Sequence, residues 1–320
     1  MELFKNTKFD FVGRRRIAMA VSTLVIVAGI ISLIIQGGPN YGIDFTGGLL
    51  VQVKFDQAIK VEPIRDAMRE INLGQSIIQH FGERDEVLIR VVAKGSDTDE
   101  SVVAKQIETT LKEKFGENSV EIRRIEMVGP RIGEELRTSA LLAIGGAIVG
   151  ILIYIAFRFD LLFGIAAIIA LIHDVLVTIG LLSITHKEVD LTVVAAVLTI
   201  VGYSLNDTIV VFDRIRENLR LVRKQGYPTL INDSLNQTLN RTLLTSLTTL
   251  LVVACLFLFG GEVIHNFSFA LLVGVVVGTY SSIFVASPIL VEWHSFRNKA
   301  KGSHSAKAGK VVRQDTKKRG

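Results

Sequence analysis

Cysteine is nearly absent from this sequence, whose 320 residues include only Cys255. A single cysteine excludes an intramolecular disulfide and any metal site built from a cysteine cluster. Because Cys255 lies within an apolar stretch, we expect a small buried thiol. The sequence also lacks a G-x-x-x-x-G-K-[ST] phosphate loop, a G-x-S-x-G elbow and an H-E-x-x-H motif. It therefore predicts no intrinsic nucleotide motor, no enzymatic activity, no cofactor and no metal site.

Charged residues are also scarce, at 21%, whereas hydrophobic residues reach 49% and the mean hydropathy is +0.43. A soluble chain of this length would have more charge and fewer long apolar runs. A bilayer core about 30 Å thick requires roughly 20 apolar residues of helix. Six stretches meet that requirement: 17–35, 138–157, 161–183, 191–212, 242–260 and 267–291. We therefore predict a multi-span α-helical membrane protein with six transmembrane helices.

Basic residues are distributed unevenly between the loops of these spans. They are frequent in segment 1–16, after the fourth span and in the tail at 292–320, which all lie on one side of a six-span chain. The opposite loops, 186–190 and 261–266, contain one lysine between them. The positive-inside rule then predicts that both termini are cytoplasmic and that the long segment 36–137 is external.

The external segment 36–137 has the pattern of a small α+β domain. Alternation of apolar and polar residues predicts strands at 48–55, 76–80, 86–92 and 120–128. Helical spacing predicts helices at 61–73 and 98–115. The resulting order, βαββαβ, is that of the ferredoxin-like fold. That fold has many functions, so the domain alone indicates none.

Two further segments are predicted on the cytoplasmic side. Residues 212–225 place apolar side chains on one side and arginines on the other, which predicts an amphipathic helix at the membrane surface. Either lipid or a partner protein could cover its apolar side. The basic tail at 292–320 is predicted to be a topology anchor, and its residues from 298 onward are predicted to be disordered. Nucleic-acid binding would require more than such a tail, so no nucleic-acid partner is predicted.

Ionisable residues inside the spans are the candidate functional residues, because an aspartate at a helix centre costs about 2.5–3.5 kcal/mol. Asp174 follows His173 near the middle of span three. Since neighbouring helical residues lie on adjacent faces, these two are not expected to point to one site. A relay role and a structural hydrogen bond both remain open for Asp174. No second ligand lies three or four residues from His173, which argues against a metal site.

Asp207 in span four and Arg241 at the start of span five are predicted to face each other, because the two spans share an inner loop. Burial favours a neutral carboxylic acid, whereas a nearby guanidinium favours the carboxylate, so a change in their separation could move a proton. Polar residues extend both faces: Ser204, Asn206, Thr245, Thr248 and Thr249. A hydrated proton path and a structural ion pair with close helix packing both fit this pattern.

Four segments of the sequence resemble the SecD/SecF family. One is the run YGIDFTGG at 41–48, which on its residues alone is a turn leading into a strand and which contains Gly42, Asp44, Gly47 and Gly48. The others are IHDV at 172–175, VGYSLNDTIVVFDRIREN at 201–218 and NQTLNRTLLTSLTT at 236–249. The run in span four is similar to the most distinctive motif of the SecF branch. The resemblance covers residues 10–295.

The resemblance implies a subunit of the bacterial Sec protein-export apparatus with a fold related to RND transporters. Its implied partners are SecD, the SecYEG channel, YajC, indirectly SecA, and the translocating polypeptide, within the lipids of the cytoplasmic membrane. The proton motive force is implied to drive export, with Asp207, Arg241 and Asp174 in the proton pathway. Two alternatives remain: a scaffold that moves no protons, and half of an RND-type exporter of small molecules or lipids.

Overall fold

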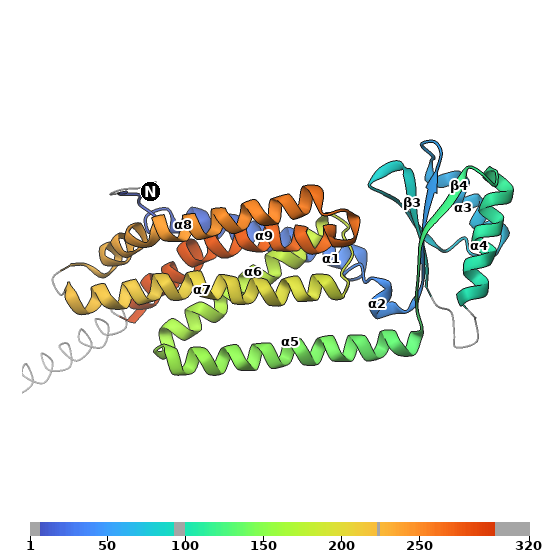
Figure 1. Ribbon diagram of the computed structural model, residues 1–320. Helices are drawn as coiled ribbons and strands as arrows, with labels where there is room; N and C mark the ends of the chain where they lie inside the picture. Colours follow the sequence, from blue (N-terminus) through green and yellow to red (C-terminus); the bar gives the residue numbers. More distant parts are fainter. Residues whose placement is uncertain (1–6, 93–99, 223–224, 298–320) are drawn as a thin grey trace, which may run out of the picture.

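Long helices and a small sheet occupy separate parts of the molecule. The computed structural model describes residues 7–92, 100–222 and 225–297. The helices form a bundle, and the α+β domain lies at one end of it (Figure 1). Residues 1–6 of the predicted N-terminal segment, residues 298–320 of the predicted tail and residues 223–224 lie outside the described part of the chain.

Six helices in the described residues are long and apolar enough to cross a membrane. They are α1 (Arg15–Gln36), α5 (Pro130–Arg158), α6 (Leu161–Ile184), α7 (Leu191–Leu221), α8 (Tyr227–Phe259) and α9 (His265–Ser281). A π-helical segment, Ser282–Ala286, follows α9, and the helix then continues to Arg297. The predicted multi-span architecture is confirmed.

The helices α7 and α8 extend well beyond the predicted spans on the side away from the α+β domain. Segment 212–225 is not a separate helix at the membrane surface, because α7 continues without a break to Leu221. Phe212 and Ile215 are fully buried and belong to the same core cluster as Ile231 of α8. The amphipathic pattern therefore reflects packing against other helices.

The apolar stretch around Cys255 also has a different environment from the predicted one. Cys255 lies on an exposed side of α8, as do Leu251 and Val252. The expectation of a buried thiol was wrong, because a membrane-spanning helix is apolar on its outer face as well as its inner face. The apolar run at this position faces outward from the bundle.

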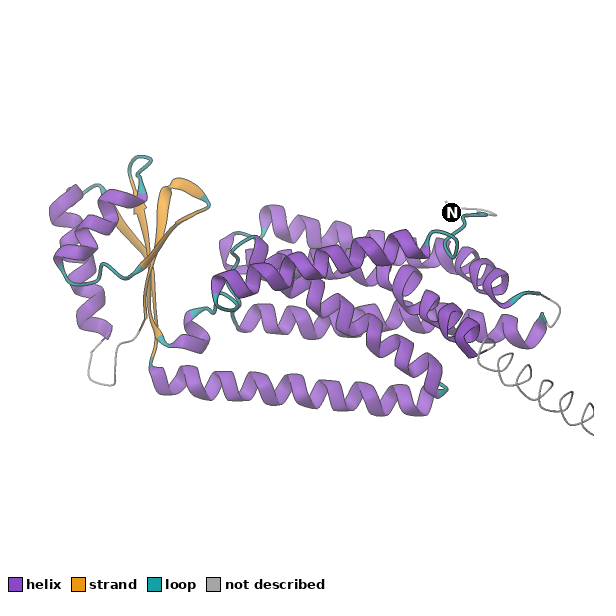
Figure 2. Cartoon of the chain, turned by 180° about the vertical axis from the view of Figure 1, so that it is seen from behind, coloured by secondary structure: helices purple, strands orange, loops and turns teal. Residues whose placement is uncertain are grey.

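The α+β domain has the predicted ferredoxin-like order. Its elements are β1 (Gly48–Phe55), α3 (Val61–Glu70), β2 (Ile77–Phe81), β3 (Glu83–Val92), α4 (Glu100–Phe115) and β4 (Val120–Val128). The sheet order is β2-β3-β1-β4, with every neighbouring pair antiparallel. Alternate residues such as Val51 and Ile89 pack with Ile64 of α3 and Ile107 of α4. Both helices cover the side of the sheet that faces away from the bundle (Figure 2).

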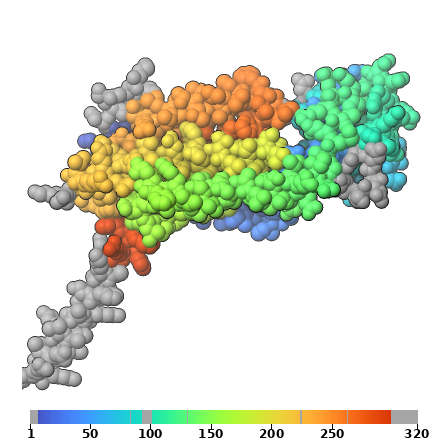
Figure 3. Space-filling model, turned by 60° about the horizontal axis from the view of Figure 1, so that its bottom comes forward, coloured from blue at the N-terminus to red at the C-terminus, as the bar shows by residue number. Residues whose placement is uncertain are grey.

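Two connections join the domain to the bundle. A short helix, α2 (Ile43–Thr46), lies between α1 and β1. On the other side, α5 follows β4 and runs along the outside of the bundle, where it is green in Figure 3. Gly133 of α5 packs closely on Gly47, so that an added Cβ at Gly133 would lie 2.9 Å from the Gly47 nitrogen. The glycine-rich signature therefore lies where both connections meet.

Replacing Gly29 by alanine is expected to lower the stability of the bundle. Gly29 of α1 meets Gly180 of α6, and a Cβ on Gly29 would lie 2.6 Å from the Gly180 Cα. Because backbone atoms cannot move aside singly, we expect a loss of about 1–3 kcal/mol. Thermal unfolding of the detergent-solubilised protein measures it. Gly146→Ala is the matched control, since no atom lies within 4 Å of that position; equal stability of the two variants would contradict the prediction.

Candidate functional site

Two carboxylates are buried inside the helix bundle. Asp174 of α6 is 1% exposed, and Asp207 of α7 is 2% exposed. A charge at such depth is costly unless other groups solvate it. Both side chains find hydrogen-bond donors on neighbouring helices, so the two acids organise the polar interior of the bundle.

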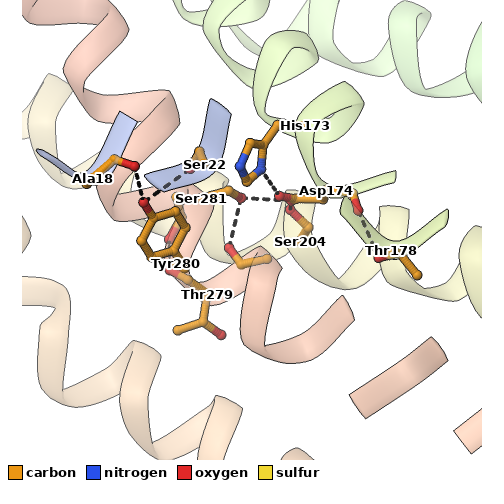
Figure 4. Close-up of polar contacts among 11 residues, drawn as sticks. Ala18, Ser22, His173, Asp174, Thr178, Ser204, Thr279, Tyr280 and Ser281 are labelled. Carbon is orange, nitrogen blue, oxygen red and sulfur yellow. Dashed lines mark hydrogen bonds and ion pairs between the residues drawn. The ribbon is translucent and has the colours of Figure 1, made fainter. Parts of the chain in front are cut away.

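Asp174 has three polar partners, shown in Figure 4. Ser204 of α7 donates to Asp174 Oδ2 over 2.5 Å, and Ser281 of α9 donates to the same oxygen over 2.7 Å. His173 Nδ1 lies 2.8 Å from Asp174 Oδ1. The expectation that His173 and Asp174 would not point to one site was wrong, because the two neighbouring side chains hydrogen-bond to each other.

Ser204 thus binds Asp174, whereas the sequence pattern grouped it with Asp207. It was expected to extend the polar face of Asp207, but its hydroxyl binds Asp174. The reason is that α7 lies between α6 and α8, and Ser204, one turn from Asp207, faces the α6 side.

Asp207 is bound by hydroxyls of two other helices. Ser246 of α8 donates to Asp207 Oδ2 over 3.3 Å, and Thr279 of α9 lies 3.5 Å from the same oxygen. Thr279 Oγ1 also donates to Ser246 Oγ over 2.6 Å. These longer contacts leave Asp207 less tightly held than Asp174. The site around Asp207 therefore has more freedom to rearrange.

The helix α9 connects the two acids. Thr279 contacts Asp207, and Ser281, two residues later, contacts Asp174. The π-helical segment Ser282–Ala286 follows directly. Single π-helical turns inside α-helices occur frequently at functional sites. Between the two contacts, Tyr280 donates its hydroxyl to the Ala18 carbonyl of α1 over 2.7 Å (Figure 4).

Arg241 and the threonines of α8 do not contact Asp207. No ion pair joins Asp207 and Arg241 among the described residues, and the hydrogen-bond partners of the carboxylate there are Ser246 and Thr279. Arg241 is exposed, and the hydroxyls of the three predicted threonines bond to backbone carbonyls of α8 itself: Thr245, Thr248 and Thr249. Asn206 of α7 is exposed as well.

The rotation of α8 explains why the predicted ion pair is not formed. The face of α8 that is turned toward the interior has the buried residues Thr242 and Ser246. Arg241, one residue earlier, points away from it. The prediction of a direct contact was therefore wrong for this chain alone. Arg241, Thr245 and Thr248 of α8 and Asn206 of α7 are exposed outside the bundle, and we call them the outward-facing polar residues.

The signature residues near 41–48 form the connection to α7. Asp44 Oδ2 accepts a hydrogen bond from the Leu191 backbone N–H over 3.0 Å, at the first turn of α7. Gly47 and Gly48 have φ angles of 67° and 128°, which side-chain-bearing residues rarely adopt. Gly42 lies against Asp190, with 3.3 Å between an added Cβ and the Asp190 Cβ. The signature thus fastens the start of the α+β domain to the helix that contains Asp207.

The chemistry available at this site is proton binding. Hydroxyl groups both donate and accept hydrogen bonds, and carboxylic acids exchange a proton readily. Within the described residues, no three His, Cys, Asp or Glu side chains gather as metal ligands. The sequence indicated the acids through their cost in a membrane, but Ser246, Thr279 and Ser281 were missed. Ser246 lies within the run 236–249, where only the neighbouring threonines were singled out, and Thr279 and Ser281 are single hydroxyls in an apolar helix.

Six membrane-spanning helices, a ferredoxin-like domain between the first two of them and two linked buried acids define a polytopic membrane protein with a polar interior. The family profile described as "Protein export membrane protein SecD/SecF, C-terminal" matches residues 106–296, and the "SecD/SecF GG Motif" matches residues 32–59. The chain belongs to the SecD/SecF family.

Individual relatives show the same likeness. The chain is 50% identical over 293 residues to the protein translocase subunit SecF of Magnetococcus marinus, covering 91% of this chain and 94% of that one. It is 50% identical over 290 residues to the SecF of Desulfurispirillum indicum, covering 88% and 91% of the two chains.

Solved SecDF structures share the fold. The SecDF of Thermus thermophilus superposes with a TM-score of 0.81 at 38% identity, over 91% of this chain and 39% of that one. A SecDF structure in a super-membrane-facing form superposes with a TM-score of 0.67 at 38% identity, over 94% and 41% of the two chains. The chain therefore spans about two fifths of these SecDF chains.

Proposed function

We propose that this chain is an accessory subunit of the Sec protein-export machinery that, together with SecD, uses the proton motive force to promote polypeptide translocation. The observation that supports proton coupling is the pair of buried acids linked through hydroxyls of α9. Protonation removes the charge of a carboxylate and turns one of its oxygens from a hydrogen-bond acceptor into a donor. Packing among α6, α7, α8 and α9 would then depend on the protonation state of Asp174 and Asp207.

SecD is the partner proposed for the outward-facing polar residues. Asn206, Arg241, Thr245 and Thr248 are exposed in this chain alone, although they lie in membrane-spanning helices. Polar groups at such depth generally face protein or a water-filled cavity instead of lipid. The SecDF chains of known structure are more than twice as long as this chain, which supports a proposal that a further part, SecD, covers these residues. An acidic residue of SecD is the proposed partner of Arg241.

The proposed location is the cytoplasmic membrane, with both termini in the cytoplasm and the α+β domain outside. The distribution of lysine and arginine between loops supports this orientation. SecYEG, YajC and indirectly SecA complete the proposed assembly, with the exported polypeptide near the α+β domain and lipids on the apolar outer faces. No nucleotide hydrolysis of its own is assigned to the chain.

Reconstitution tests this function directly. Vesicles containing this chain, its SecD partner and the channel are assayed for translocation with and without a proton gradient. We expect Asp207→Asn and Arg241→Met to remove the benefit of the gradient, because one loses the exchangeable proton and the other the neighbouring charge. A fall of about tenfold or more lies within the usual range of coupling between sites.

The control is Asp233→Asn, which removes an exposed carboxylate of α8 that takes no part in the hydrogen bonds around Asp174 and Asp207. Assembly with SecD is verified for each variant by co-purification. If the variant complexes assemble normally and keep the full benefit of the gradient, the two residues are structural. The chain is then a scaffold of the translocase, and the proton-coupled function is wrong.

A further inference from the structure

The α+β domain contacts the bundle through the loop between α6 and α7, residues 185–190. Gly42 donates its backbone N–H to the Val189 carbonyl over 2.9 Å, and Val189 donates to the Asn40 carbonyl over 2.8 Å. Tyr41 and Val189 pair as an isolated parallel bridge. The loop is thus paired with the segment that leads from α1 into the domain.

A buried ion pair fastens the sheet to the same loop. Arg90 of β3 is 3% exposed and forms an ion pair with Glu188. Arg90 Nη1 also donates to the Tyr41 carbonyl over 3.0 Å, and Gln79 of β2 donates to Glu188 Oε1 over 2.9 Å. Burial lowers the pKa of the Arg90 guanidinium, because removal of water disfavours the charged form. Glu188 therefore provides the countercharge that this buried cation requires.

The face of the sheet that contacts the loop is the one that α3 and α4 do not cover. Along β3, Val87 and Ile89 point into the core beneath those helices, whereas Leu88 belongs to a separate cluster with Ile43 of α2. Since side chains alternate along a strand, Arg90 lies on the same side as Leu88. The uncovered side is the one turned toward the bundle in Figure 1.

The loop is the common end of the two helices that contain the buried acids. Asp174 lies on α6, which precedes the loop, and Asp207 lies on α7, which follows it. Asp44 adds a direct contact to the first turn of α7 by accepting from the Leu191 N–H. Any displacement of α7 relative to α6 must therefore change the position of residues 185–190. Coupling between distant sites is carried by packed, hydrogen-bonded and rigid elements that have two arrangements, and these contacts are candidates for such elements.

We propose that Arg90 and Glu188 are positioning residues that couple the acid-bearing helices to the α+β domain, so that the domain moves with the α6–α7 loop. This inference rests on the proposed function, because it assigns the path by which proton binding would reach the domain. The ion pair holds β2 and β3 on the loop, while Asp44 holds the entry to β1 on α7. The two contacts thus hold the domain to the loop and to α7 at separate points.

The test separates proton movement from translocation. The double variant Arg90→Met/Glu188→Leu removes both charges, so that neither remains buried without a partner. In vesicles with SecD and the channel, proton flux and translocation are both measured with and without the gradient. We expect proton flux close to that of the wild type and a fall of about fivefold or more in the benefit of the gradient to translocation.

The matched control is Lys54→Met/Asp85→Asn. Lys54 and Asp85 form an ion pair of 3.7 Å within the same sheet, between β1 and β3. This control is expected to keep both activities. If Arg90→Met/Glu188→Leu keeps the full benefit, or loses proton flux together with it, the coupling role is wrong. If the wild-type complex itself shows neither proton flux nor a benefit of the gradient, the proposed function is wrong instead.

A disulfide between residues 41 and 189 is expected to restore the coupling that Arg90→Met/Glu188→Leu removes. Because Cys255 is the only cysteine of this chain, Cys255→Ser leaves the chain free of other thiols. Tyr41→Cys and Val189→Cys are then added to Arg90→Met/Glu188→Leu, since residues 41 and 189 are bridge partners. Once thiol labelling verifies the disulfide, the benefit of the gradient is expected to return and to disappear again on reduction. A formed disulfide without restored coupling would overturn the proposal.

Discussion

Asp174→Asn is expected to leave the assembled complex stable and to remove most of its response to the proton gradient. The asparagine carbonyl can accept from Ser204 and Ser281, which both donate to one carboxylate oxygen. Once His173 adopts the tautomer whose Nδ1 has no proton, the asparagine amide group can donate to Nδ1, which lies 2.8 Å from the other oxygen. Since the network keeps its hydrogen bonds, the free energy of unfolding should fall by no more than about 1 kcal/mol.

The loss of function follows from the loss of an exchangeable proton. Asparagine binds no proton near neutral pH, so the hydroxyls of Ser204 and Ser281 would always donate to a neutral acceptor. If proton binding at Asp174 contributes to coupling, the benefit of the gradient to translocation should fall about tenfold or more. The measurement is translocation by reconstituted vesicles with and without the gradient, with assembly verified by co-purification with SecD.

Asp174→Leu distinguishes this role from a structural one. Leucine leaves the Ser204 hydroxyl and the His173 imidazole buried without an acceptor, and each such group costs about 1–3 kcal/mol. A structural aspartate would therefore make the leucine variant unstable but leave the asparagine variant fully active. If Asp174→Asn retains the whole response to the gradient, Asp174 is a structural hydrogen-bond acceptor and Asp207 acts without it.

The α+β domain was predictable because its sheet has one covered and one uncovered side. Strands 48–55 and 120–128 have the predicted bounds, since alternation of apolar and polar residues is strong there. The helices α7 and α8 were predicted too short, because hydropathy detects only the part that crosses the bilayer. Their ends are held by other contacts, such as the hydrogen bond from Asn218 to Ser234 over 2.8 Å.

The acids of the site were predictable, but their surroundings were not. A charge in an apolar helix stands out because of its cost, which is how Asp174 and Asp207 were found. Serine and threonine in such helices usually bond to their own backbone, so nothing in the sequence marked Thr279 or Ser281. The rotation of α8, which turns Arg241 outward, depends on packing with other helices. Contacts such as that between Asp44 and Leu191, 147 residues apart, leave no spacing signal.

Glu188→Ala is expected to lower the free energy of unfolding more than a change at a partly exposed glutamate of the same sheet, because Glu188 pairs with Arg90 where the α+β domain contacts the α6–α7 loop. Removing one partner of a buried ion pair leaves the other charge uncompensated, which typically costs 3–5 kcal/mol. Arg90 is 3% exposed, so little water would reach its guanidinium once Glu188 is removed. Gln79 also loses the oxygen to which it donates. Thermal unfolding of the purified complex, together with proteolysis of segment 37–47, measures the loss.

Glu86→Ala is the matched control for this change. Glu86 also lies on β3 and accepts a hydrogen bond from Gln52 of β1 over 2.8 Å, but it is partly exposed, and no hydrogen bond or ion pair joins it to the bundle within the described residues. We expect it to cost about 1 kcal/mol or less, because solvent replaces the lost contact. Equal stability of the two variants would contradict a tightly enclosed ion pair between the sheet and the loop.

The double variant Arg90→Met/Glu188→Leu is expected to be more stable than Glu188→Ala alone. Replacement of both partners by apolar side chains removes the buried charge together with its countercharge, and such exchanges are often neutral for stability. A stable double variant that has lost coupling would show that the ion pair matters for transmission between the two parts. A double variant as unstable as Glu188→Ala would instead show that the ion pair mainly holds the fold together.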